Sequence, residues 1–167
     1  MNQALKQLAI FVRDLLTYDE QLIRIGRENY TRKDFSQPYI VVDGIGPQTR
    51  ISRANYYDGD TETQSLGVRM NAPCTLNFYG PDAYDTAVQF TLMMASQTSL
   101  ELQKTQGITV YRVSSLTDVK ALTGQQYGEN IELQLNVEYN QSIDLSVKRI
   151  DTAQIEILSE QGQELIP

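Results

Sequence analysis

The chain of 167 residues carries a formal net charge of −7 and contains one cysteine and no histidine. This composition excludes Ser-His-Asp triads, Cys-His dyads, internal disulfides and the usual zinc ligand sets. An acidic balance also disfavours binding to the nucleic-acid backbone, because phosphate contacts need clustered lysine and arginine. The length favours a single domain over 1–167. No stretch approaches the ~20 apolar residues that a membrane-spanning helix needs.

Near the start of the chain, apolar residues recur at helical spacing and predict an amphipathic helix over residues 2–18. A second, short helix is expected over residues 19–25, with Gly26 as its stop signal. Residues 28–37 are polar without a clear period and predict a loop. A short apolar strand follows over residues 39–42. The chain is therefore expected to begin with helices and to reach its first strand after a loop.

The clearest hairpin signal lies around residues 49–70. Strand-forming residues precede the turn pair Asp58-Gly59, in which Gly59 can adopt a positive φ without steric cost. The return strand alternates apolar and polar residues over 66–78, which predicts one buried face. Pro73 interrupts this pattern and predicts a bend, a bulge or an edge position. We expect the hairpin to project from the domain.

A single long helix is predicted next. Pro81 suits its first position, where the missing N–H costs nothing, and Gly107 closes its last turn. A strand over 108–113 and a polar connection over 114–128 follow, the latter with room for one helical turn near residues 118–122. The buried stripe of the helix is expected at Ala83, Ala87, Phe90, Met94 and Leu100.

Strict alternation of apolar and polar residues over 131–139 predicts the most regular strand of the chain. Residues 140–142 are expected to form a tight turn, 143–147 the returning strand, and 154–158 a last strand. Strands joined by tight turns form mainly antiparallel sheets. The predicted fold class is therefore α+β, a mainly antiparallel sheet with one long helix and an N-terminal helix packed on one face.

The residues whose side chains could take part in catalysis or metal binding are better explained by structural roles. Cys74 lies on the apolar side of its predicted strand without an activating neighbour, and is expected to be a small core residue. Asp58 and Asp60 lack the remaining ligand spacing of a calcium loop and predict an acidic hairpin tip. Glu132 and Glu138 share the polar side of one strand, expected to be solvated or buried against a neighbouring subunit. We therefore expect no enzyme activity and no catalytic, metal-binding or cofactor-binding residue.

A small basic and aromatic group adjoins the hairpin turn. Arg50 and Arg53 are flanked by Tyr56 and Tyr57, a combination that can bind a partner or nucleic acid. Charged strand residues that protect a sheet edge explain the arginines equally well. The chain also has ten tyrosines, a residue type enriched at protein interfaces because its ring is apolar and its tip polar.

Three groups of segments, taken together, carry a resemblance that covers about residues 5–157. The first is the N-terminal helix with Gly26-Arg27-Glu28-Asn29 and Pro38-Tyr39-Ile40-Val41 after it. The second is Leu76-Asn77-Phe78-Tyr79-Gly80 leading into Pro81-Asp82-Ala83-Tyr84-Asp85-Thr86-Ala87. The third is Gly107-Ile108-Thr109-Val110, then Leu116-Thr117, Gln126-Tyr127 and the alternating strand 131–139. In this arrangement the chain resembles the tail-terminator or neck-terminator proteins of tailed bacteriophages.

The resemblance implies a structural protein of the virion, assembled in the host cytoplasm. It implies a homo-oligomeric ring, commonly of six copies, that ends the tail tube and joins it to head-completion or neck proteins. DNA would pass through the ring without sequence-specific binding, and no membrane partner is implied. Within this interpretation the hairpin tip and the polar connection are expected to make ring or partner contacts. The residues predicted for these contacts are Arg50, Arg53, Tyr56, Tyr57, Asp58, Gly59, Asp60, Thr117, Asp118, Gln126 and Tyr127.

Two other functions fit the same sequence. One is a different structural role in the same particle, as another neck or tail-tube subunit. The other is a small-molecule binding module, which would need a concave apolar pocket with a few convergent polar groups. The position of the protein in the particle separates the first from a terminator, and the presence of such a pocket tests the second.

Overall fold

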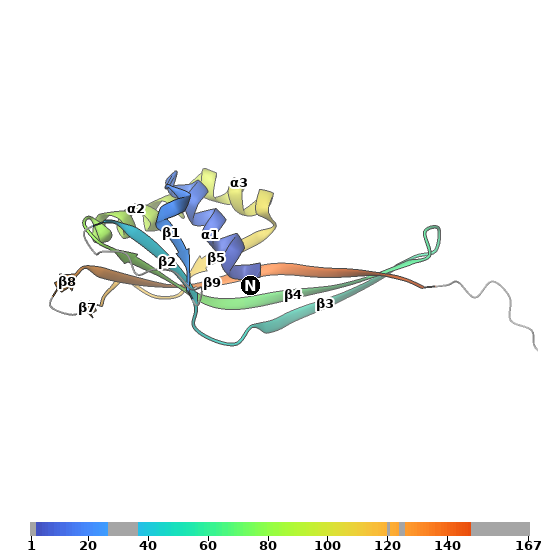
Figure 1. Cartoon of the computed structure of the whole chain (residues 1–167). Helices are drawn as coiled ribbons and strands as arrows, with labels where there is room; N and C mark the ends of the chain where they lie inside the picture. The colour runs from blue at the N-terminus through green and yellow to red at the C-terminus, as the bar shows by residue number, and fades with distance from the viewer. Residues whose placement is uncertain (1–2, 27–36, 120, 124–125, 148–167) are drawn as a thin grey trace, which may run out of the picture.

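The computed structural model describes residues 3–26, 37–119, 121–123 and 126–147. These residues form an α+β fold in which helices cover one face of a largely antiparallel sheet (Figure 1). None of the described helices is long and apolar enough to span a membrane. The helices are α1 (Gln3–Leu16), the 3₁₀ turn η1 (Glu20–Leu22), α2 (Ala83–Met93) and α3 (Gln97–Gln106). The strands are β1 (Ile23–Ile25), β2 (Tyr39–Gly44), β3 (Thr49–Asp58), β4 (Thr63–Tyr79), β5 (Ile108–Arg112), β6 (Thr117–Asp118), β7 (Ala121–Thr123), β8 (Gln126–Gly128) and β9 (Asn130–Ser146).

The main sheet has seven strands. Five follow the order β1-β2-β4-β9-β5, while β3 pairs with β4 and β6 pairs with β9. β1 runs parallel to β2, and the other pairs are antiparallel. The two 17-residue strands β4 and β9 pair along their whole length, from Thr63 opposite Ser146 to Tyr79 opposite Asn130. They form the long axis of the molecule (Figure 1).

The core lies between the sheet and the helices α1 and α2. Phe90 of α2 meets Phe11 of α1 edge to face, with ring centroids 6.4 Å apart, and lies 6.1 Å from the ring of Phe78 in β4. These three buried rings join both helices to the sheet. The alternating strand residues that face the helices are Ala72, Cys74, Leu76 and Phe78 of β4 and Ile131, Leu133, Leu135, Val137 and Tyr139 of β9.

Two helices replace the single long helix that the sequence predicts from Pro81 to Gly107. The chain leaves the helical path before Ser96, whose side chain caps α3 by accepting a hydrogen bond from the Ser99 amide at 3.2 Å. The break turns Leu100 outward, so that it is 59% exposed instead of part of the buried stripe. Gly107 ends α3 with a positive φ of 65°, as predicted.

Replacing Ser96 by alanine is expected to lower the free energy of unfolding by about 1 kcal/mol, because the Ser99 amide loses its acceptor. Urea denaturation measures the change. Thr98→Ala is the matched control, since Thr98 is an exposed residue of the same first turn and its replacement should cost less than about 0.5 kcal/mol. Equal losses for the two variants would contradict a capping role for Ser96.

β9 runs without interruption through residues 140–142, where the sequence predicts a tight turn. Asn140 and Ser142 lie opposite Arg69 and Gly67 of β4, so the ladder continues. Polar residues do not end the strand here, because this part of the sheet has no helical layer over it and accepts polar side chains on both faces (Figure 1).

Residues 19–25 form η1 and the short strand β1 instead of a second helix. Asp19 starts η1 by accepting a hydrogen bond from the Gln21 amide at 2.9 Å. The β-branched residues that follow pair with β2, because isoleucine packs well on a pleated, half-buried surface. Residues 118–122 likewise contain strand residues of β6 and β7 where a helical turn is expected. The predicted loop 28–37, except for its last residue, and the predicted strand 154–158 lie outside the described residues.

Pro73 lies within the continuous strand β4, which is not an edge strand of the sheet. On one side it is opposite Asn136 of β9. On the other side it falls between Cys74, the last residue of β4 paired with β2, and Asn71, the first paired with β3. At Ala72 and Pro73 the strand has a paired neighbour on one side only, and a sheet tolerates proline at such a position.

Candidate assembly surfaces

The most prominent feature of the molecule is a ribbon that extends beyond the helices (Figure 1). It consists of β3, residues 63–71 of β4 and residues 138–146 of β9, and we call it the arm. In its middle, Leu66 of β4 lies between Asn55 of β3 and Ile143 of β9. The hairpin expected around 49–70 supplies two strands of the arm, and β9 adds the third.

Strand alternation divides the basic and aromatic residues that precede the arm tip. Arg53 and Tyr57 pair with β4 residues on the face that continues the helix-covered face of the sheet. Arg50 joins them because a bulge directly after it shifts the register by one residue. Tyr56 belongs to the opposite face. All four side chains are exposed, but they do not form the one patch that their spacing suggests.

The tip of the arm is an acidic turn over residues 59–62. The Asp58 carboxylate accepts a hydrogen bond from the Asp60 amide at 3.0 Å. This bond, together with bonds from Thr61, lowers the pKa of Asp58. Glu62, and not Gly59, adopts the positive φ, at 51°. A turn held by an aspartate side chain therefore replaces the expected glycine-centred turn.

The remaining predicted contact residues lie at the other end of the molecule. Thr117 and Asp118 form β6 and pair with the start of β9. Gln126 and Tyr127 belong to β8, which pairs with β7 in a separate two-stranded hairpin. Figure 1 shows β7 and β8 at one end and the arm tip at the opposite end. The predicted residues thus form two distant groups, and their role in contacts remains a prediction.

On the polar side of the sheet, two carboxylates bind side chains of neighbouring strands. Glu138 accepts from Arg69 at 2.6 Å and from the Tyr111 hydroxyl at 2.9 Å. Burial and then the neighbouring Glu138 charge raise the pKa of Tyr111. Ser65 donates to Asp144 at 2.6 Å. These pairs stabilise the ladder, and they give the Glu138 and Asp144 carboxylates a structural role between strands.

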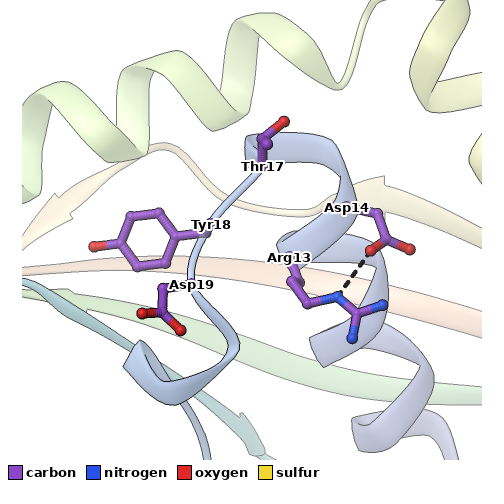
Figure 2. Close-up of a pocket in the computed structure, with 5 residues that line it drawn as sticks. All are labelled: Arg13, Asp14, Thr17, Tyr18 and Asp19. Carbon is purple, nitrogen blue, oxygen red and sulfur yellow. Dashed lines mark hydrogen bonds and ion pairs between the residues drawn. The ribbon is translucent and has the colours of Figure 1, made fainter.

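A shallow depression lies at the C-terminal end of α1 (Figure 2). Arg13 pairs there with Asp14 at 2.8 Å and with Glu20 at 3.1 Å. The charged groups neutralise one another at the surface, and the lining comes from one short stretch of chain, so the depression lacks the convergent polar groups of a binding pocket. Its lining residues are Arg13, Asp14, Thr17, Tyr18 and Asp19.

Cys74 is fully buried in the core, as predicted. Burial and the neighbouring Asp43 charge raise the pKa of its thiol to about 12. The nucleophilic form of cysteine is the thiolate, which this environment suppresses at neutral pH. Within the described residues, no group of three or more His, Cys, Asp or Glu side chains is placed to hold a metal ion.

Cys74 should therefore be unreactive toward a thiol reagent in the folded protein and react fully after denaturation.

The raised pKa also predicts loss of stability at high pH. The unfolded chain releases the thiol proton near pH 9.0 and the folded chain only near 12, so stability falls as the pH rises through this window. Urea denaturation at several pH values measures the slope. A Cys74→Ala variant with an unchanged slope would contradict the assignment.

Comparison with known families matches residues 2–161 to the family described as phage neck terminator protein. Comparison with curated proteins found no match. The family match includes the helices, the sheet and the arm, and so covers nearly the whole chain. A protein of this family is a structural component of the virion that contacts other head or tail proteins of the phage. The chain belongs to the phage neck terminator protein family.

Proposed function

We propose that this protein forms a ring, of six copies, that ends the tail tube and connects it to the head-completion or neck proteins. DNA passes through the ring without sequence-specific binding. The whole chain acts as one domain, and the ring assembles in the host cytoplasm before it becomes part of the virion. The observation that carries this proposal is the family match over residues 2–161.

Two physical features support a ring. A closed ring needs a heterologous contact, in which one patch meets a different patch of the next copy. The arm tip and the β7–β8 hairpin lie at opposite ends of an elongated subunit (Figure 1), so each copy has two ends available for different neighbours. The net charge of −7 supports passage of DNA, because an acidic surface repels phosphates and does not retain them.

The mass of the purified protein in solution tests the ring. Light scattering, alone and with the tail-tube protein of the same phage, should give six times the 18.9 kDa of one chain in at least one of the two conditions. A monomer under both conditions would overturn the proposal.

Tail length in phage that lacks the protein tests termination separately. Overlong tubes are expected, and tubes of normal length would favour another neck or tail-tube role.

The acidic tip and the 114–128 connection are proposed to contact the ring neighbours or the other neck proteins. Reversing the tip charges, with Asp58→Lys and Asp60→Lys together, should weaken assembly with the neck partners. Thr61→Ser is a suitable control, because it lies in the same exposed turn, changes no charge and keeps the hydroxyl that bonds to Asp58. Assembly of the charge-reversed protein at the wild-type level would remove the tip from the contact.

A further inference from the structure

One face of the arm continues the apolar face of the core without a layer to cover it. In β4 the row that includes Leu76 and Cys74 in the core continues as Val68 and Leu66 in the arm. Ile143 and Leu145 continue the same row in β9, because paired residues of neighbouring strands share a face. We call this surface the helix-side face of the arm. Beyond Arg50 and Met70, this face consists of Arg53, Asn55, Tyr57, Gln64, Leu66, Val68, Gln141, Ile143 and Leu145.

The helices end before this face begins (Figure 1). Ile143 is 58% exposed, Tyr57 44% and Leu145 39%, while the residues of the same row over the core are buried. The opposite face of the arm is mostly polar, since β4 and β9 carry serines, asparagine and the paired charges of Arg69 and Glu138 there, and the exposed Tyr56 of β3 is its large aromatic residue. An apolar row on one side of an exposed ribbon marks an interaction surface.

The helix-side face is also positively charged. Arg53 lies within it, and the face includes no Asp or Glu among the paired residues of the three strands. Among the described residues Arg53 has no ion-pair partner. A surface that fits this face must therefore be apolar and carry unpaired acidic side chains.

Helix α2 of another copy has such a surface. Tyr84 and Leu92 lie two helical turns apart on one side of α2, with Val88 between them, and are 56% and 70% exposed. Asp85 adjoins this stripe in the first turn, is exposed, and has no ion-pair partner within the described part of the chain. Phe90 and Ala87 bury the other side of the same helix. A helix that is apolar on both sides is expected to be covered on both sides.

The two surfaces cannot meet within one subunit, because α2 and the arm lie toward opposite ends of the molecule (Figure 1). We propose that the helix-side face of the arm packs on the Tyr84–Leu92 stripe of α2 in a second copy of this chain, with Arg53 paired to Asp85. Each copy then offers its arm to one neighbour and its α2 to the other. This inference rests on the proposed ring and names the contact that closes it.

Alternation along β9 supplies a matched pair of variants. Ile143→Glu places a charge on the helix-side face of the arm. Ser142→Glu places the same charge one residue earlier, on the opposite face of the arm. Both residues are exposed, so both variants should fold, which circular dichroism and the melting temperature verify. Ile143→Glu should weaken ring assembly about tenfold or more, and Ser142→Glu by less than about twofold. Equal assembly of the two variants would overturn the proposal.

A charge exchange tests the partner surface. Arg53→Asp and Asp85→Arg should each weaken assembly, and the double variant should recover most of it, because the ion pair reforms in reverse. Additive losses in the double variant would show that the two residues do not meet. Rings of Ile143→Glu that assemble normally but fail to bind tail tubes would assign the face to the tail protein instead. These outcomes would overturn the contact between the arm and α2 but not the proposal that the protein forms a ring. Wild-type protein that never forms a ring would overturn the proposed function itself.

Discussion

Replacing Phe90 by alanine is expected to lower the free energy of unfolding by about 3–5 kcal/mol. Phe90 is fully buried and its ring contacts those of Phe11 and Phe78, so the substitution removes the group that joins α1, α2 and the sheet. The rigid elements around it cannot close the cavity completely, and the lost contacts are not replaced. Because a domain of this size has only about 5–15 kcal/mol of stability, the variant should be marginally stable. Chemical denaturation measures the difference.

Tyr84→Ala is the matched control on the same helix. It removes an aromatic ring of similar size from the exposed side of α2, and should cost the isolated subunit less than about 1 kcal/mol. In the assembled ring the same substitution should weaken the contact between copies. A stability loss for Phe90→Ala as small as that for Tyr84→Ala would mean that the three rings do not organise the core.

Replacing Gly80 by alanine is expected to cost about 3 kcal/mol, at the upper end of the range for backbone strain. Gly80 has a φ of 88°, where a Cβ atom is unfavourable, and an added Cβ would lie 2.5 Å from the carbonyl oxygen of Gln37. That neighbour is backbone and not a flexible side chain, so the entry to β2 must shift. The Gly80 amide also donates to the Glu129 carbonyl at 3.3 Å, which couples the strain to the start of β9.

Gly107→Ala separates the cost of the left-handed backbone conformation from the cost of the steric clash, which both contribute to the loss at Gly80. Gly107 has a similar φ of 65°, but an added Cβ would meet nothing within 4 Å. Its replacement should cost about 1–2 kcal/mol, the penalty of the left-handed conformation alone. The difference between the two variants, measured by thermal or urea denaturation, reports the steric term at Gly80. Equal losses would mean that the chain near Gln37 yields without cost.

Stability is expected to be unevenly distributed between the core and the arm. The core half of the sheet has helices on one side, whereas the arm has only strand pairing and exposed side chains in the single subunit. Backbone hydrogen bonds exposed to solvent open more easily than those of a packed core. Assembly that covers the helix-side face would stabilise the arm, because a partner that binds only the folded form shifts the folding equilibrium.

The continuous strand β9 shows how local chemistry can mislead. The alternation over 131–139 continues in phase through Tyr139, Gln141 and Ile143, which all face the same side of the sheet. The polar residues Asn140 to Ser142 resemble a turn only because turn residues and solvent-exposed strand residues share the same chemistry. Residues 140–142 form a strand and not a turn because β4, about 70 positions earlier in the chain, supplies their pairing partners.

The break between α2 and α3 has a local cause that a periodicity argument overlooks. The segment has no glycine or proline at the break, and its apolar residues continue at roughly helical spacing past Ser96. A serine can cap a helix or lie inside one, and only the geometry selects between the two. Here its hydroxyl serves the Ser99 amide, and the changed direction leaves Leu100 exposed.

The sequence by itself determined that histidine-based triads and an internal disulfide cannot form, the type of most elements, and a resemblance that the family match confirms. These features depend on composition, on local periodicity and on the order of segments. The tertiary structure alone decided that β9 adds a third strand to the arm, that Arg53 and Tyr57 share a face without Tyr56, and that Ile143 is exposed. Register, bulges and the extent of the helical layer set these features. Each arises from contacts between residues that are far apart in the chain.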